Sequence, residues 1–224
     1  RGFGTIDRAR VRLIPGIGVD TMAFAEEAID PDEVEAVRHE LAVPADAFML
    51  LMIAEFAPVK RHAFVLDALA RVPDGHVVLV LAGAGPLEED VRAEVTRLGL
   101  GDRVRFAGYR RDIPALLAAS DALVLASRRE GLARSVLEAM SAGRPVIGTR
   151  TRGIADAVPE GTGWIVPADD PAALAKAIHD AAGFPAEVAR RGAAARSVAR
   201  RTYDLPLIID AYEELYRDAL ASRV

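Results

Sequence analysis

The stretch ALVLASRREGLARSVLEAMSAGRPVIGT, residues 122–149, has the order of a strand, a loop, a helix and a second strand. The apolar run Ala122–Ala126 predicts a strand, and the amphipathic run Leu132–Ala142 predicts a helix. A Gly-Arg-Pro turn then leads into a second apolar run at Pro145–Gly148. Apolar runs with little polar alternation are typical of parallel strands that are buried on both faces of a sheet. The stretch therefore predicts one β-α-β unit.

The same alternation extends in both directions along the chain, and it predicts an α/β fold with a single Rossmann-like, doubly wound parallel sheet. After about Phe184 the strand signal stops, and two closing helices are expected at Ala186–Arg200 and Pro206–Ala221. The other expected strands are Val11–Ile14, Phe48–Ala54, Val77–Ala82, Val104–Ala107 and Trp164–Val166. The other expected helices are Asp32–Leu41, Arg61–Arg71, Leu87–Leu98, Ile113–Ala119 and Ala172–Ala181.

Composition narrows the classes of protein that fit. The 224 residues carry a formal net charge of −5, whereas nucleic-acid-binding domains usually show a basic surplus. The chain has no cysteine, which excludes disulfides, thiolate nucleophiles, zinc ribbons and iron–sulfur clusters. It has no apolar run long enough for a transmembrane helix and no secretory signal, so a cytoplasmic location is expected.

Ligands of open α/β sheets bind outside the carboxyl ends of the strands, so the loops there carry the functional signal. In one of them, Glu130 precedes the expected helix and Glu138 lies inside it. Free backbone amides at a helix amino end favour an anion, and carboxylates accept paired hydrogen bonds from vicinal diols. Eight helical residues span about 12 Å, which matches the reach from the sugar of a nucleotide sugar across its diphosphate to the ribose. Taken alone, the two glutamates favour a simpler interpretation, in which Glu130 stabilises the helix dipole and Glu138 faces solvent.

The residues around the two glutamates resemble the retaining glycosyltransferases of the GT-B fold, in particular family 4, the glycosyl transferases group 1. The signature is a pair of glutamates eight positions apart, in which the second glutamate lies in Leu-Glu-Ala-Met and Pro-Val-Ile follows, and Glu130–Ile147 matches it. Further matches occur in family order from about Val11 to Ile178, among them LAGAGPL at Leu81–Leu87 and GTGWIVPADDPAALAKAI at Gly161–Ile178. The matching parts are those of the C-terminal, donor-binding domain.

The resemblance implies a role for each matching residue. Glu130 would contact hydroxyls of the transferred sugar as the catalytic-site carboxylate, and Glu138 would hold the ribose. Lys60 would contact the donor phosphates, Gly131–Arg134 would pass close to the diphosphate, and backbone near Tyr109 and Arg110 would meet the base. The implied donor-binding residues are Lys60, Gly85, Tyr109, Arg110, Gly131, Leu132, Ala133, Arg134 and Glu138. No metal and no cofactor are expected, and a UDP- or GDP-sugar is the expected donor.

Two departures from the family pattern concern positive charge. Many members have an arginine a few residues before the lysine, where this chain has Glu55. Arg61, Arg128 or Arg129 could substitute for it. Arg134 could reach a phosphate or face solvent, and the two interpretations have equal weight. His62 follows Lys60 closely, and a packing role is its simpler interpretation.

The resemblance also implies a second domain. GT-B enzymes place the active site between two domains, and residues 1–224 have the length of one, so we expect the N-terminal acceptor domain to be absent from this chain. An isolated donor domain is expected to be inactive. The expected acceptor is a glycan, a lipid-linked sugar or a small molecule, with peripheral association of the full-length protein at the inner membrane face left open. A GT-B-fold sugar-nucleotide epimerase and a non-catalytic nucleotide-sugar binding domain are the alternative functions.

Overall fold

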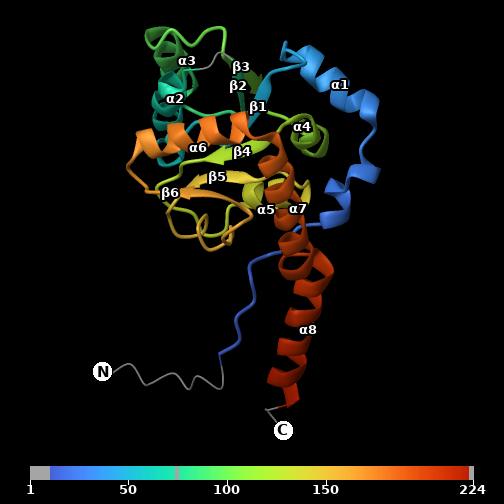
Figure 1. The fold of residues 1–224 in the computed structure, drawn as a ribbon. Helices are drawn as coiled ribbons and strands as arrows, with labels where there is room; N and C mark the ends of the chain where they lie inside the picture. Colours follow the sequence, from blue (N-terminus) through green and yellow to red (C-terminus); the bar gives the residue numbers. More distant parts are fainter. Residues whose placement is uncertain (1–10, 74–75, 222–224) are drawn as a thin grey trace, which may run out of the picture.

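A six-stranded parallel sheet runs through the middle of the computed structural model, which describes residues 11–73 and 76–221 (Figure 1). The strand order is β3-β2-β1-β4-β5-β6, so the sheet grows outward in both directions from the β1–β4 pair. This order is that of a doubly wound sheet and confirms the predicted fold class. The strands are β1 (Phe48–Ile53), β2 (Val77–Ala82), β3 (Val104–Gly108), β4 (Ala122–Leu125), β5 (Val146–Thr149) and β6 (Gly163–Val166).

Aliphatic side chains explain why these segments form central strands. All six residues of β2 and all four of β4 are buried, and both segments consist of Val, Leu and Ala. β1 pairs in register with β2 from Phe48↔Val77 to Ile53↔Ala82. Helices cover both faces of such a sheet, so side chains on either face of the strands enter the core.

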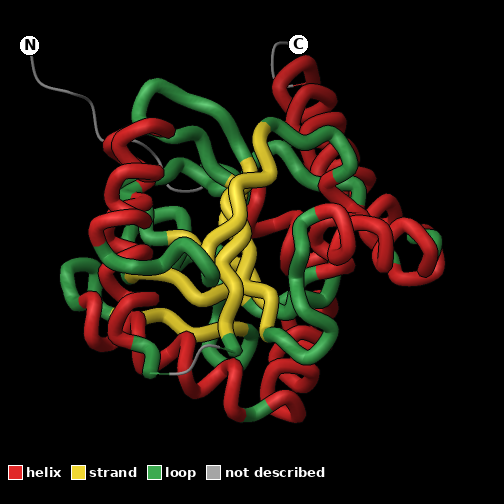
Figure 2. The backbone as a smooth tube through the Cα atoms, turned by 90° about the horizontal axis from the view of Figure 1, so that it is seen from above, coloured by secondary structure: helices red, strands yellow, loops and turns green. Residues whose placement is uncertain are grey.

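Two helical layers enclose the sheet, as Figure 2 shows from above. Helix–helix contacts join α2, α3 and α6 in one layer and α1, α4, α5 and α7 in the other. Asp30 and Asp170 cap α1 and α6 with their carboxylates, and both helices begin with proline, as helix starts favour. The helices are α1 (Pro31–Glu40), α2 (His62–Arg71), α3 (Glu88–Arg97), α4 (Ile113–Ala119), α5 (Arg134–Ser141), α6 (Pro171–Gly183), α7 (Pro185–Thr202) and α8 (Leu205–Ala221).

Helix α8 projects beyond the two layers, and the segment that starts at Val11 lies beside it (Figure 1). Arg12 joins the two through ion pairs with Glu214 and Asp218. Within the described part of the chain, no helix combines the length and the hydrophobicity that a membrane crossing needs.

Two predicted elements need correction. Val11–Ile14 forms no strand: Leu13 is 94% exposed, and the sheet offers this segment no neighbouring strand. The ion pairs of Arg12 join the segment to α8 instead. Helix α5 begins at Arg134 rather than at Leu132. Ala133 has an extended backbone and serves as the N-cap, which leaves Leu132 in the loop.

Candidate functional site

The β1–β4 boundary is the point at which the strand order reverses, and in doubly wound sheets ligands bind outside the carboxyl ends of the strands there. The loop after β1 contains Lys60, and the loop after β4 contains Glu130. The two loops are held together by a hydrogen bond of 2.9 Å from the Arg128 amide to the Val59 carbonyl. The topology therefore brings the two predicted residues to one place.

Backbone hydrogen bonds continue this connection along the carboxyl edge of the sheet. The Phe56 amide donates to the Ala84 carbonyl at 3.2 Å, and the Gly83 amide donates to the Gly108 carbonyl at 2.8 Å. A Cβ on Gly83 would lie 2.0 Å from the Ala54 carbonyl oxygen, and one on Gly85 would lie 2.7 Å from backbone atoms of Phe56. Glycine at these two positions lets the loops after β1 and β2 pack directly against each other.

Lys60 and Glu130 form the central ion pair of this edge, with Nζ 2.6 Å from Oε1. Their side chains are only 23% and 11% exposed. Solvent screening is weaker for such a pair than for a surface ion pair. Glu130 is further fixed by its backbone, because Gly153 packs so closely that a Cβ there would lie 2.8 Å from the Glu130 carbonyl oxygen. No sequence signal had singled out Gly153.

Arg61 shapes the turn next to Lys60. It adopts a left-handed backbone conformation with φ +58°, which is uncommon for a residue with a side chain. Its guanidinium donates to the Ala168 carbonyl at 2.6 Å, pairs with Asp169 at 3.0 Å and lies 4.0 Å from the centre of the Phe64 ring. These contacts occupy the side chain, so the structure removes Arg61 from the candidates for a substitute phosphate-binding cation.

Helix α5 carries the second predicted carboxylate. Glu138 is 8% exposed, which excludes the interpretation of a solvated glutamate on a free helix face. Helix α5 contacts β4 and β5 on one side and α7 on another, so the helix has little free surface. Arg134 Nε donates to Glu138 Oε1 at 2.8 Å, and the Arg134 side chain is 73% exposed. Burial raises the pKa of Glu138, and the hydrogen bond from Arg134 opposes the rise.

The amino end of α5 fits an anion. Ala133 at the N-cap offers no side-chain acceptor, and the first turn has no acidic residue. The first amides of a helix lack intrahelical partners, and the helix dipole places partial positive charge there. Gly131 is exposed in the loop that leads to this end, and Leu132 packs against the turn at Gly16.

The residues predicted to lie near a base sit further along the same edge. Tyr109 is 75% exposed, directly after Gly108 at the end of β3. The Arg110 guanidinium pairs with Asp112 and with Glu40 of α1, so its side chain is engaged. Gly85 lies in the neighbouring loop, against Phe56.

His62 has the packing role expected of it. Its ring stacks on Phe56 with 4.5 Å between the centroids, and the residue is 4% exposed. Burial and, to a smaller degree, the charge of Lys60 lower its pKa from 6.5 to about 4. The imidazole is therefore neutral at physiological pH and carries no positive charge into the site.

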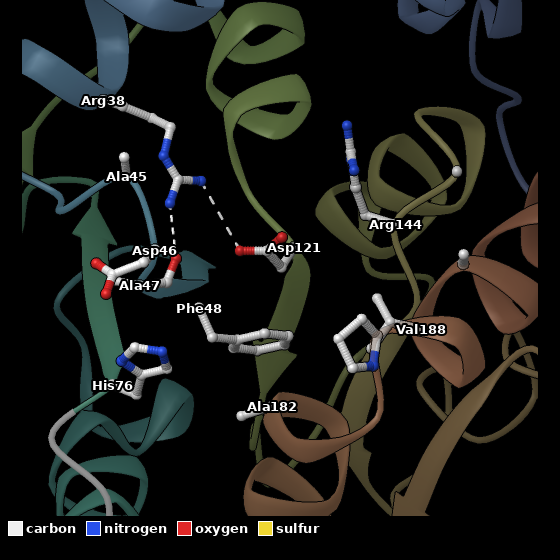
Figure 3. Close-up of a pocket in the computed structure, with 13 residues that line it drawn as sticks. Arg38, Ala45, Asp46, Ala47, Phe48, His76, Asp121, Arg144, Ala182 and Val188 are labelled. Carbon is white, nitrogen blue, oxygen red and sulfur yellow. Dashed lines mark hydrogen bonds and ion pairs between the residues drawn. The ribbon is translucent and has the colours of Figure 1, made fainter.

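A pocket of about 430 Å³ lies at the opposite, amino edge of the sheet (Figure 3). Phe48 begins β1 there, and Asp121 directly precedes β4. Arg38 crosses the pocket to the Ala47 carbonyl at 2.7 Å and lies 3.8 Å from Asp121. Asp121 in turn accepts a hydrogen bond from the Met49 amide. These polar groups join α1 to the strand starts, and no residue predicted for the functional site lines this pocket.

Comparison with known proteins identifies the family. The sequence profile described as glycosyl transferases group 1 matches residues 47–182, which include Lys60, Glu130 and Glu138. The chain belongs to the glycosyl transferases group 1.

The similarity between this group 1 chain and its curated relatives covers more of the chain than residues 47–182. The lipopolysaccharide core biosynthesis glycosyltransferase LpsD of Rhizobium meliloti is 33% identical over 83% of this chain and 54% of its own length. The putative glycosyltransferase EpsD of Bacillus subtilis is 32% identical over 86% of the chain and 51% of its own length. The chain thus spans about half the length of these relatives.

Solved structures agree with the group 1 assignment. HepE of Anabaena, crystallised in complex with UDP, has a TM-score of 0.83 and 27% identity over 90% of this chain and 56% of its own. Sucrose-phosphate synthase of Thermosynechococcus elongatus has a TM-score of 0.82 and 29% identity over 94% of this chain and 53% of its own. The sheet with its flanking helices therefore corresponds to one half of a GT-B structure.

Proposed function

We propose that this chain is the donor-binding domain of a retaining glycosyltransferase that moves a sugar from a nucleotide diphosphate sugar to an acceptor hydroxyl. The observation that carries the proposal is the meeting of Lys60 and Glu130 at the β1–β4 switch point, beside the uncapped amino end of α5. A phosphate-binding cation, a sugar-binding carboxylate and free amides are the groups that a sugar diphosphate needs.

The proposed roles follow the order of the groups along the edge. Glu130 contacts hydroxyls of the transferred sugar, Lys60 and the backbone of Gly131–Arg134 contact the diphosphate, and Glu138 holds the ribose. Backbone groups at Gly85, Tyr109 and Arg110 border the base. HepE was crystallised with UDP and with UDP-glucose, so a UDP-sugar is the first donor to test.

Catalysis in this proposal is electrostatic and needs no metal. The leaving diphosphate develops negative charge, which Lys60, a second cation and the α5 amides would stabilise in the transition state. Undiminished transfer in the presence of a chelator is the expected result. A requirement for Mg²⁺ or Mn²⁺ would contradict this part of the proposal.

The acceptor side of the site belongs to the rest of the protein in this proposal. The chain spans about half of its relatives, and α8 exposes Leu207, Ile209 and Tyr216. These side chains could pack against an N-terminal acceptor domain, which would complete the active site and set any contact with the inner face of the membrane. We expect the isolated chain to bind donor and to transfer no sugar.

Calorimetry of the isolated chain with UDP, GDP and ADP tests the donor site. At least one nucleotide should bind, and Glu138→Ala should weaken that nucleotide more than it weakens inorganic phosphate, because only the nucleotide has a ribose. A folded sample that binds none of the three would overturn the proposed function. Equal losses for nucleotide and phosphate would overturn the ribose assignment.

A further inference from the structure

Each carboxylate of the proposed donor site is paired with a cation of the same site. Lys60 holds Glu130 at 2.6 Å, and Arg134 holds Glu138 at 2.8 Å. We propose that these two ion pairs exchange partners when donor binds, and that Arg134 is the second diphosphate-binding cation, replacing the arginine that is absent at Glu55. The proposal rests on the proposed function and states how the four charged residues of the donor site act together when donor binds.

The exchange follows from the hydrogen-bond partners that the two cations and the two carboxylates can find in the donor. Within the described residues, Lys60 is the side-chain partner of Glu130, and Arg134 is that of Glu138. A diphosphate offers both cations an acceptor with more negative charge and more oxygens than one carboxylate, and sugar and ribose hydroxyls offer both carboxylates new donors. The carboxylates therefore lose their ionic partners at the moment at which hydroxyl donors arrive, and no buried charge is left without a partner.

Helix stability does not explain the position of Arg134. It is the first residue of α5, where the helix dipole disfavours positive charge. It also precedes its acid by four residues, the less favourable order for a helical ion pair. Among the described residues, four other arginine pairs with this four-residue spacing have the acid first: Asp67–Arg71 on α2, Glu88–Arg92 on α3, Glu187–Arg191 on α7 and Glu213–Arg217 on α8.

The position of Arg134 does suit an anion that binds at the same helix end. Its side chain is 73% exposed, so the guanidinium can leave Glu138 without rearrangement of the core. A planar guanidinium can donate two parallel hydrogen bonds to a phosphate. Arg61 is excluded by its contacts with Ala168 and Asp169. Arg128 and Arg129 are exposed in the loop before the helix and are the competing candidates.

Inorganic pyrophosphate separates the two halves of the exchange, because it binds the cations but has no sugar or ribose hydroxyl for the carboxylates. Arg134→Gln should weaken pyrophosphate binding by about tenfold or more, the scale of one charge-assisted hydrogen bond. Glu138→Gln should strengthen it severalfold, because Arg134 is then free. Glu130→Gln should strengthen pyrophosphate through Lys60 and at the same time weaken a UDP-sugar.

A double-mutant cycle distinguishes exchange from simple repulsion between Glu138 and the anion. If Glu138 acts by holding Arg134, Glu138→Gln should have little effect in the Arg134→Gln background. Simple repulsion predicts the same gain in both backgrounds and would overturn the exchange. The control is Lys176→Gln, because Lys176 is 75% exposed and pairs with Asp180 on α6. It lines a hollow with Arg71 and Pro73 at the carboxyl end of α2, whereas Lys60 precedes the amino end of that helix. This control should leave the pyrophosphate affinity unchanged.

The experiment is calorimetric titration of the whole chain with pyrophosphate and with UDP, with circular dichroism to show that each variant is folded. One outcome overturns the assignment of Arg134 and leaves the proposed function intact. In that outcome the wild-type chain binds UDP, Arg134→Gln leaves pyrophosphate binding unaffected, and Arg128→Gln or Arg129→Gln abolishes it. Wild-type chain that binds neither pyrophosphate nor UDP, GDP or ADP overturns both proposals.

Discussion

Lys60 Nζ lies 2.6 Å from Glu130 Oε1, although the two residues are 70 positions apart in the sequence. The contact exists because β1 and β4 are neighbours in the sheet and end at the same edge. Only Arg61, with its left-handed backbone and its anchor on Ala168, stands between Lys60 and the start of α2. The ion pair thus depends both on the sheet topology and on the local turn at Arg61.

Loss of the lysine charge should weaken nucleotide binding. Lys60→Ala removes one charge-assisted contact to phosphate, so we expect UDP to bind about 10- to 100-fold more weakly. Lys176→Ala removes the same charge from an exposed helix pair and is the control. Calorimetry measures both affinities, and equal UDP binding by the Lys60 variant and the wild type would contradict a phosphate contact.

The fold was predictable because the strands are short aliphatic runs between amphipathic helices. The runs at Phe48–Ala54 and Val77–Ala82 differ from the observed β1 and β2 by one residue or none. Val11–Ile14 also has three aliphatic residues in four but is largely exposed, because the aliphatic pattern cannot tell whether a neighbouring strand is available. Strand order itself is decided by packing and not by any single segment.

A methyl group at Gly83 should destabilise the chain and disturb the site. The Cβ would lie 2.0 Å from the Ala54 carbonyl oxygen, and the backbone at φ +150° disfavours a side chain. We expect Gly83→Ala to reduce the free energy of unfolding by about 1–3 kcal/mol, the usual cost of overpacking.

The control for this substitution is Gly101→Ala. A Cβ on Gly101 has no heavy atom within 4 Å, so that variant should stay within about 1 kcal/mol of the wild type. Urea unfolding measures both variants. Equal stability of the two would mean that the loops after β1 and β2 can separate at little cost.

Protonation of His62 should destabilise the fold in acid. Its pKa is about 4 when folded and 6.5 in the unfolded chain, so the unfolded chain binds more protons between these values. Stability should therefore rise with pH from about 4 to 6.5, and the full effect is about 3 kcal/mol. His62→Phe keeps a ring against Phe56 but cannot titrate, so it should show a shallower dependence on pH.

Urea unfolding at pH 4 to 7 measures this dependence for the wild type, for His62→Phe and for a control in which the exposed His179 is replaced by Phe. The His179 variant should follow the wild type. Parallel curves for the wild type and His62→Phe would show that His62 does not carry the acid sensitivity.

The candidate site was predictable in its residues but not in its pairing. Both glutamates and the lysine lie in a motif or a loop that can be read from the chain, whereas their ionic partners depend on side-chain directions. Glu138 illustrates the limit. A helical pattern places it opposite an apolar stripe, which usually means solvent, but α5 is enclosed by β4, β5 and α7. Burial on several sides is a property of the assembled layers.

Burial of Glu138 also has a pH signature with the opposite sign from that of His62. Burial raises the pKa of this carboxyl above its ordinary value of 4.5, and Arg134 only partly opposes it because the guanidinium is largely solvated. The folded chain therefore binds more protons than the unfolded chain in the interval above pH 4.5, and stability falls as the pH rises through it.

Glu138→Gln removes that titration, so the stability of this variant relative to the wild type should increase from pH 4 to pH 7. Urea unfolding across this range gives the difference directly, with Glu213→Gln on the exposed face of α8 as a control that should show no such trend. A difference that stays constant with pH would mean that Arg134 fully compensates the burial, and the ion pair would then be stronger than its exposure implies.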